Sequence, residues 1–152
     1  MFYFTAFYRS LISLGNFLQP IFLLAVRLFW GWQFFKAGLG KLDDITGTAS
    51  FFETLGIPAP ELNAYLAAST ELVGGLFLML GLASRLVALP LIGTMIVALL
   101  TAHYQATANI FDDPVKFVNQ PPFTFLMASA IILIFGPGLF SIDAAIKRAR
   151  SI

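Results

Sequence analysis

The 152-residue chain contains no cysteine, a single histidine and few charged residues. Without cysteine it cannot form disulfides, present a thiol nucleophile or hold an iron–sulfur cluster or a thiolate metal site. One histidine is too few for bis-histidine haem ligation or for a metal site of its own. We therefore expect this chain alone to hold no metal, haem or iron–sulfur cluster, which leaves a non-covalent cofactor as the basis for any redox chemistry.

Charged residues are scarce in this chain and apolar residues are abundant. They make up 11% of the chain against 59% hydrophobic residues, and the mean hydropathy is +0.85. A soluble domain carries roughly 25% charged residues. The composition predicts an integral membrane protein with the lipid bilayer as its first partner. The length suits one domain, residues 1–152, and a net charge of +1 gives no reason to expect nucleic acid as a partner.

Four apolar stretches approach the roughly 20 residues that cross a bilayer as a helix. They cover approximately residues 21–39, 62–82, 86–104 and 123–139. Proline is tolerated in the first helical turn, and prolines near the four starts fit this rule: Pro20, Pro60, Pro90, Pro121 and Pro122. The run from Gly136 to Gly138 should end the last helix early. The sequence predicts an all-α fold, a four-helix transmembrane bundle.

Two segments outside these spans are also rich in aromatic and aliphatic residues. Residues 1–19 carry one charge, Arg9, and predict an interfacial amphipathic segment rather than a signal peptide, since no small-residue cleavage site follows a short apolar core. In the first long loop, Ser50 and Glu53 have capping-box spacing and Gly56 can close the helix. This short helix is either an ordinary interfacial helix or a lid over a pocket between the spans.

The distribution of basic residues predicts the orientation. One side carries five of them: Arg9, Arg85, Lys147, Arg148 and Arg150. The other side carries at most three basic residues, with acidic residues nearby, and these three are Lys36, Lys41 and Lys116. Because cytoplasmic loops are enriched in lysine and arginine, we expect both termini to face the cytoplasm and the two longer loops to face the outside.

Two helical stripes combine charges with glycines. Steps of four, three, four and three residues place the first set on one helix face: Arg27, Gly31, Phe34, Gly38 and Lys41. The second span repeats this arrangement, with Gly75 adjoining: Glu71, Gly74, Leu78, Gly81 and Arg85. We expect both stripes to face the interior. Close helix packing is the favoured interpretation of the glycines, and ligand contact is the alternative.

Glu71 and Arg27 are predicted to lie inside the hydrocarbon layer, where an ionised side chain needs a partner, a water-filled cavity or a functional role. Glu71 can pair with Arg27, or with the more outward Lys36 or Lys41. Such a pair either fixes helix register or forms a polar site for a proton, a quinone carbonyl or a lipid headgroup. His103, at the outer end of the third span, is either a hydrogen-bonded interfacial residue or a donor to a quinone oxygen.

Several motifs occur together in a specific order. They are RLFWGWQFFKAGLGKL (Arg27 to Leu42), LGIPAP (Leu55 to Pro60), ELVGGLFLMLGLASRL (Glu71 to Leu86), His103, and GPGLFSIDAA (Gly136 to Ala145). In this order they resemble the DoxX family of small four-helix bacterial membrane proteins. The resemblance implies the bacterial cytoplasmic (inner) membrane. Founding members are described as the small subunit of a membrane thiosulfate:quinone oxidoreductase, and others as membrane partners of enzymes that handle oxidative and thiol stress.

Carried over residue by residue, the family pattern points to nine positions: Arg27, Gly31, Gly38, Lys41, Glu71, Gly74, Gly75, Arg85 and His103. The resemblance thus implies a membrane subunit of a quinone-linked oxidoreductase, with Glu71 and His103 as catalytic residues. Its non-covalent quinone would be bound by Arg27, Gly31, Gly38, Lys41, Gly74 and Gly75. The alternative is a non-enzymatic module that binds lipid or a partner protein, or assembles a complex. The expected protein partner is a redox subunit or a second copy of the chain. An ion or proton channel has a weaker basis because the charges are few.

Overall fold

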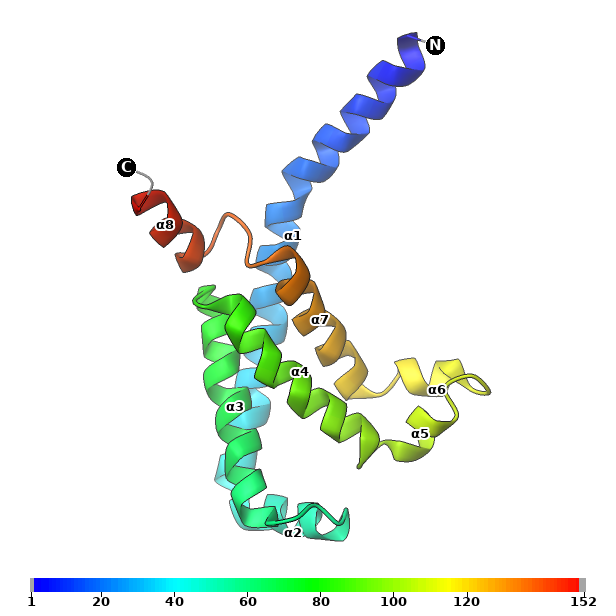
Figure 1. The fold of residues 1–152 in the computed structure, drawn as a ribbon, viewed down its shortest axis with the longest axis vertical. Coiled ribbons are helices and arrows are strands. Elements are labelled where there is room, and N and C mark those ends of the chain that lie inside the picture. Colours follow the sequence, from blue (N-terminus) through cyan, green and yellow to red (C-terminus); the bar gives the residue numbers. More distant parts are fainter. Residues whose placement is uncertain (1, 151–152) are drawn as a thin grey trace.

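The computed structural model describes residues 2–150, which form helices and, within that range, no β-strand (Figure 1). Met1, the first residue of the predicted interfacial segment, lies outside the described residues. In chain order the helices are α1 (Phe2–Asp43), α2 (Ile45–Thr54), α3 (Pro60–Leu80), α4 (Ser84–Leu100), α5 (Tyr104–Ala108), α6 (Pro114–Val118), α7 (Pro121–Phe135) and α8 (Ile142–Ala149). The all-α prediction is confirmed.

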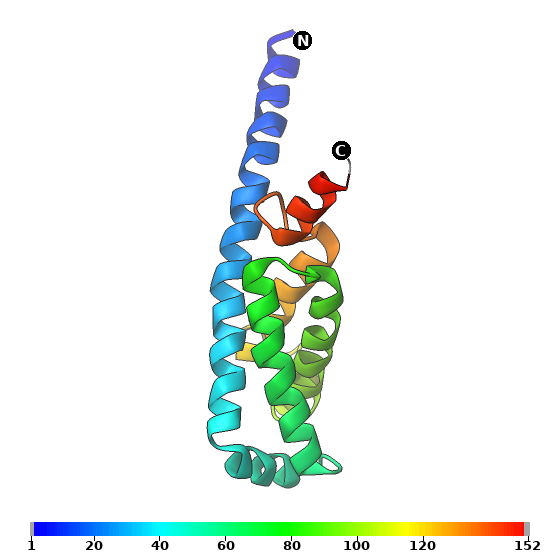
Figure 2. The same cartoon turned by 90° about the vertical axis from the view of Figure 1, so that its left-hand side faces the viewer.

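The four longest helices pack around a shared apolar core. Helix α1 lies along α3 and α4 lies along α7, and the two pairs meet where α3 contacts α4 and α1 contacts α7 (Figures 1 and 2). The buried core residues are Leu23, Val26, Phe34, Leu78, Leu91, Met95, Ala128 and Ile132. Many large apolar side chains on the outside of these helices remain exposed. Extensive exposed apolar surface is typical of a membrane interaction site.

Two helices are long and apolar enough, by length and composition, to cross a membrane: residues Phe7–Asp43 of α1, and α3. Helices α4 and α7 are apolar but have only 17 and 15 residues. At about 1.5 Å per residue they extend about 26 and 23 Å, less than a typical hydrocarbon layer of about 30 Å. If they cross the bilayer, it must be thinned locally around them.

Prolines have two different roles in the helices. Pro60 and Pro121 begin α3 and α7, as predicted. Pro20 and Pro90 instead lie inside α1 and α4, so the prediction that they begin helices is wrong. An internal proline removes one backbone hydrogen bond, and apolar helices tolerate this loss when neighbouring turns and helices compensate. Helix α1 therefore continues from the predicted interfacial segment into the first predicted span.

Helices α4 and α7 each end four residues before the predicted ends of their spans. Helix α7 stops at Phe135 because Gly136 follows with φ of 81°, a conformation that glycine adopts without strain. Helix α4 stops at Leu100. There the Thr107 hydroxyl donates a 2.7 Å hydrogen bond to the Leu99 carbonyl, which satisfies one of the backbone acceptors that the helix end leaves open. The chain then turns into α5.

Helix α2 begins earlier than the capping pattern predicts. The side chain of Asp44 accepts from the Gly47 N–H at 2.9 Å and caps a helix that starts at Ile45. Ser50 lies inside this helix, so the predicted capping box is wrong. The earlier aspartate is the stronger cap because it satisfies a free N–H of the first turn. Helix α2 packs against α3, beneath the body of the molecule as Figure 1 shows it.

The first half of α1 extends beyond the other helices (Figure 2). Large apolar side chains described in this half are exposed, among them Phe7, Leu11, Leu14, Phe17 and Leu18. The helix has 42 residues and is about 63 Å long, roughly twice the thickness of a hydrocarbon layer. This half therefore cannot lie within the same bilayer crossing as the packed half.

Candidate functional site

Glycines bring the backbones of α1 and α3 into contact. A Cβ atom at Gly31 would lie 2.9 Å from the carbonyl oxygen of Gly75, and one at Gly75 would lie 2.5 Å from that of Gly31. A Cβ at Gly38 would lie 2.6 Å from the carbonyl oxygen of Ala68. Gly74 faces the other way, and its Cβ would meet the side chain of Leu91 on α4 at 2.9 Å. The predicted use of these glycines in close helix packing is confirmed.

The guanidinium of Arg27 is buried at the end of α3, with 1% of the residue exposed. Its Nε and Nη atoms donate to four backbone carbonyls: Leu78 at 2.9 Å, Met79 at 3.1 Å, Pro137 at 2.5 Å and Phe140 at 3.0 Å. The last turn of a helix leaves its carbonyls without intrahelical partners, and here an arginine satisfies two of them. Arg27 therefore ties α1 to the end of α3 and to the segment between α7 and α8.

Asp143 completes this clamp. Its carboxylate accepts from the backbone N–H groups of Ala83 at 2.7 Å and Ser84 at 3.0 Å, at the start of α4. Its own N–H donates to the carbonyl of Gly81 at 3.0 Å. Gly81 has φ of 68°, and a Cβ there would lie 2.7 Å from the Arg27 guanidinium carbon. The role of the charged side chains at this end is structural: they hold the turn between α3 and α4.

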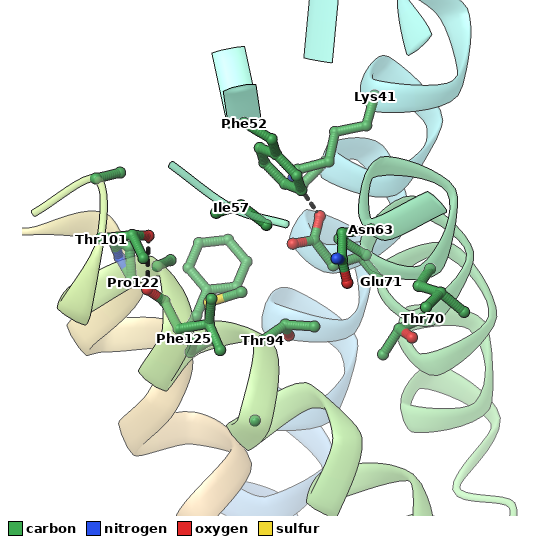
Figure 3. A pocket seen from close by; sticks show the side chains of 18 of the residues that line it. Lys41, Phe52, Ile57, Asn63, Thr70, Glu71, Thr94, Thr101, Pro122 and Phe125 are labelled. Atoms are coloured by element: carbon green, nitrogen blue, oxygen red, sulfur yellow. Dashed lines mark hydrogen bonds and ion pairs between the residues drawn. The ribbon is translucent and has the colours of Figure 1, made fainter. Parts of the chain in front are cut away.

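Glu71 pairs with Lys41. The sequence alone leaves three alternative partners for Glu71, which are Arg27, Lys36 and Lys41. The Lys41 ammonium donates to Oε2 of Glu71 in a short charge-assisted hydrogen bond (Figure 3). The two side chains are 5% and 28% exposed for Glu71 and Lys41 respectively. The guanidinium of Arg27 is instead hydrogen-bonded to backbone carbonyls at the C-terminal end of α3. The two predicted stripes thus separate into a structural clamp and an ion pair.

The ion pair forms part of the wall of a cavity of about 640 Å³. The lining comes from α1, α2, α3, α4 and α7, and from the loops that follow α2 and α4. Most of it is apolar, as Figure 3 shows for these labelled residues: Phe52, Ile57, Pro122 and Phe125. Polar groups are few, and Thr94 and Thr101 are among them. Such a combination of apolar walls with a few polar groups is typical of a site for a small amphiphilic molecule.

His103 also lines this cavity. It precedes α5, and its Nδ1 atom shares a 2.6 Å hydrogen bond with Oε1 of Gln120, the residue before α7. Gln120 was missed from the sequence because it lies 17 positions away in a polar loop, with nothing in its surroundings to mark it. Thr94 was also missed, although a hydroxyl in the middle of an apolar helix was an available signal.

The cavity brings together three of the predicted site residues: Lys41, Glu71 and His103. The other five lie outside its lining, in the glycine contacts or the clamp: Arg27, Gly31, Gly38, Gly74 and Gly75. Packing accounts for these positions, so a contact with ligand is not needed to explain them. Among residues 2–150, no three histidine, aspartate or glutamate side chains are grouped so that they could hold a metal ion.

These features define a class, a small helical membrane protein with an ion pair in the wall of a largely apolar cavity. The chain belongs to the DoxX family, whose model matches residues 22–104 and confirms the resemblance of its motifs. That match covers the α1–α3 contact, the ion pair and most of the cavity wall. It ends before Gln120 and α7.

Relatives of similar length match most of the chain. A Bacillus subtilis protein named "Putative oxidoreductase CatD" is 31% identical over 131 residues, which are 84% of this chain and 88% of that protein. The Mycobacterium tuberculosis "Uncharacterized membrane protein Rv3486" is 30% identical over 87% of this chain and 86% of its own. The Escherichia coli "Inner membrane protein YqjF" is 26% identical over 86% of this chain and 96% of its own. No solved structure gives a significant match.

Proposed function

We propose that this chain is the quinone-binding membrane subunit of an oxidoreductase. The observation that carries the proposal is an amine–carboxylate pair, Lys41 with Glu71, in the wall of a largely apolar cavity of about 640 Å³. A quinone combines an apolar ring and tail with two carbonyl oxygens that accept hydrogen bonds. The cavity offers apolar walls for the first and two donor groups, Lys41 and His103, for the second. The name of the Bacillus relative also supports oxidoreductase chemistry.

The cavity residues have distinct roles in this proposal. Lys41 or His103 donates a hydrogen bond to a quinone carbonyl, and Glu71 accepts and releases protons as a general acid–base. Conversion of a quinone to a quinol takes up two electrons and two protons. A partner subunit that oxidises a water-soluble donor supplies the electrons, since this chain has no cysteine and a single histidine. The side chains of the cavity handle the protons.

The same proposal includes the membrane arrangement. Helices α1, α3, α4 and α7 cross the bacterial inner membrane as a four-helix bundle, and both termini lie in the cytoplasm, as the basic residues predict. The inner-membrane relatives support this location. The exposed first half of α1, which is too long for the same crossing, lies along the membrane interface with Pro20 at the bend. Helix α2, which lines part of the cavity, then lies at the outer side of the bundle.

A second candidate function has its own observation. Phe51 and Phe52 of α2 line the cavity, so an apolar helix packs over a mostly apolar space. A lipid acyl chain fits such a space as well as a quinone tail does, and the Lys41 ammonium suits a lipid phosphate. In this alternative the chain is a non-enzymatic module that binds lipid, or the surface of a partner protein, and α2 acts as a lid.

Ligand retention separates the two candidates. The protein, purified in mild detergent from membranes, is examined by native mass spectrometry and by solvent extraction for quinone and phospholipid. We expect bound quinone in the wild-type protein and about tenfold weaker quinone binding in Lys41→Met, because about 1.4 kcal/mol per charge-assisted contact is a factor of ten. Lys36→Met is the matched control: its lysine is on the same helix, is exposed and lies outside the cavity. Retained phospholipid with the same Lys41 dependence supports the lipid module.

Absence of quinone, together with an unchanged quinol spectrum in the presence of the protein and its co-purified partners, overturns the quinone proposal. The role of Glu71 has its own test. We expect Glu71→Gln to leave the fold nearly unchanged and to reduce quinone turnover strongly, because glutamine keeps the shape of the side chain but cannot release a proton. Unchanged turnover in a folded Glu71→Gln variant removes the proton role.

A further inference from the structure

A second, smaller cavity adjoins the first at His103. It measures about 340 Å³ and shares three lining residues with the large cavity: Thr101, Ala102 and His103. Its other lining residues are Tyr104, Gln105, Ala106, Lys116 and Gln120. Tyr104, Gln105 and Lys116 are exposed at the surface, whereas the large cavity is lined mainly by apolar side chains. The small cavity is therefore a polar space at the surface, and the two cavities have a common wall.

His103, in the common wall, is hydrogen-bonded to Gln120, which lines only the smaller of the two cavities. The Nδ1–H of His103 donates to Oε1 of Gln120 at 2.6 Å, and the Gln120 amide nitrogen donates to the backbone carbonyl of Lys116 at 2.8 Å. This chain of bonds links the loop after α4, helix α6 and the start of α7. The contact rests on two side chains, not on packed backbone. Rotation of either side chain breaks this contact beside the wall that the two cavities share.

We propose that the small cavity is an aqueous vestibule, and that water and protons pass from it into the large cavity between His103 and Gln120. The charged groups around this route are Lys116 on α6 and, across the large cavity, Lys41 on α1 and Glu71 on α3. His103 can carry a proton on either ring nitrogen, and one of these is already within a hydrogen-bonded pair.

At the opposite end of the bundle, the Arg27 guanidinium donates to four carbonyls and the Asp143 carboxylate accepts from two N–H groups, so these two charged groups are bonded within a packed turn. Protons do not cross hydrocarbon unaided, so a reaction in the large cavity needs a polar connection to water. The use of the vestibule for quinone chemistry rests on the proposed function. The existence of the route does not.

The natural absence of cysteine makes a direct test available. A single cysteine is placed at Thr94, which lies on α4, is half-buried and lines the large cavity. The matched control is Ile96→Cys, two residues further along α4, which is 42% exposed on the outside and does not line the cavity. Each variant is held in a nanodisc, which exposes both membrane faces, and is treated with a methanethiosulfonate reagent that carries a sulfonate and does not enter hydrocarbon. Mass spectrometry measures the rate of labelling.

We expect Thr94→Cys to be labelled and Ile96→Cys to resist labelling, because a thiol reacts as its thiolate, which needs contact with water. Adding His103→Ala or Gln120→Ala should accelerate labelling of Thr94→Cys by roughly tenfold, since the thiolate becomes more accessible. Helical circular dichroism confirms that each variant is folded.

Two results overturn the proposal: a folded Thr94→Cys that stays unlabelled in every background, or labelling whose rate does not change when His103 and Gln120 are replaced. The second result would mean that water enters elsewhere. Labelling as expected in a protein that binds no quinone leaves the vestibule in place and removes only the proposed function, so the two failures are distinguishable.

Discussion

Removing Lys41 should destabilise the protein more than removing the charge of Glu71. The reason is the unequal burial of the pair: the Glu71 side chain is 5% exposed and that of Lys41 is 28% exposed. In Lys41→Met the carboxylate stays buried without its counter-charge, and loss of one partner of a buried ion pair costs about 3–5 kcal/mol. In Glu71→Gln the amide oxygen still accepts from the ammonium, which also reaches the cavity, so we expect a loss of about 1 kcal/mol.

The double variant Lys41→Met/Glu71→Gln extends the argument. It buries a neutral amide in place of an unpaired carboxylate, and an unsatisfied neutral polar group costs about 1–3 kcal/mol. We therefore expect the double variant to be more stable than Lys41→Met alone. Lys36→Met is the control for loss of a lysine from α1, and as an exposed substitution it should change stability by no more than about 0.5 kcal/mol.

The assay is unfolding in mild detergent followed by tryptophan fluorescence. Trp30 of α1 packs edge-on against Phe125 of α7 with ring centroids 5.0 Å apart, so its emission reports separation of these helices. Equal losses for Lys41→Met and Glu71→Gln, or a double variant whose loss is the sum of the two single losses, would refute the reasoning. Additive losses would mean that the two side chains are not coupled in the folded protein, and equal losses would mean that their unequal burial does not determine the cost.

Three further predictions use the same unfolding assay. Arg27→Met should lower the free energy of unfolding by about 3–5 kcal/mol because four backbone carbonyls lose a charged donor. Arg85→Met removes one exposed hydrogen bond and should lower it by at most about 1 kcal/mol. Equal losses would contradict the clamp. Gly75→Ala should cost about 1–3 kcal/mol because its Cβ collides with the α1 backbone, whereas Gly93→Ala, with open space around it, should be neutral or stabilising. Deleting residues 2–19 should leave the unfolding of the remaining body unchanged, because the side chains described there are exposed; a large loss would show that the extension packs on the body.

Local patterns predicted much of the helical architecture because they depend on neighbouring residues. Pro60, Pro121 and Gly136 mark helix ends in the structure as they do in the sequence, since a missing N–H or a positive φ acts within one turn. Pro20 and Pro90 misled the prediction because the same residue is tolerated inside an apolar helix when its neighbours compensate. Ser50 misled the prediction because Asp44 caps the helix six residues earlier.

The partner of Glu71 depended on the register between two helices. Gly31 meets Gly75, and Gly38 meets Ala68 and Leu72, so α1 and α3 run antiparallel with Glu71 near the level of residues 35–38 of α1. Lys41 is then within one turn of that level, and Arg27 is two to three turns away on the other side. The spacing of either stripe alone does not contain this offset.

The amino-acid sequence by itself determined the all-helical class, the apolar surface, the buried charges and the glycine stripes, because composition and periodicity are properties of each segment separately. Tertiary structure decided what the charges do. The antiparallel register of α1 and α3 assigned Arg27 to a backbone clamp and Glu71 to Lys41, and the packing of the loops brought His103 to Gln120. The residues in those pairs are 17 to 113 positions apart in the chain. They come into contact only when the helices have packed, so the sequence of one segment does not determine the partner.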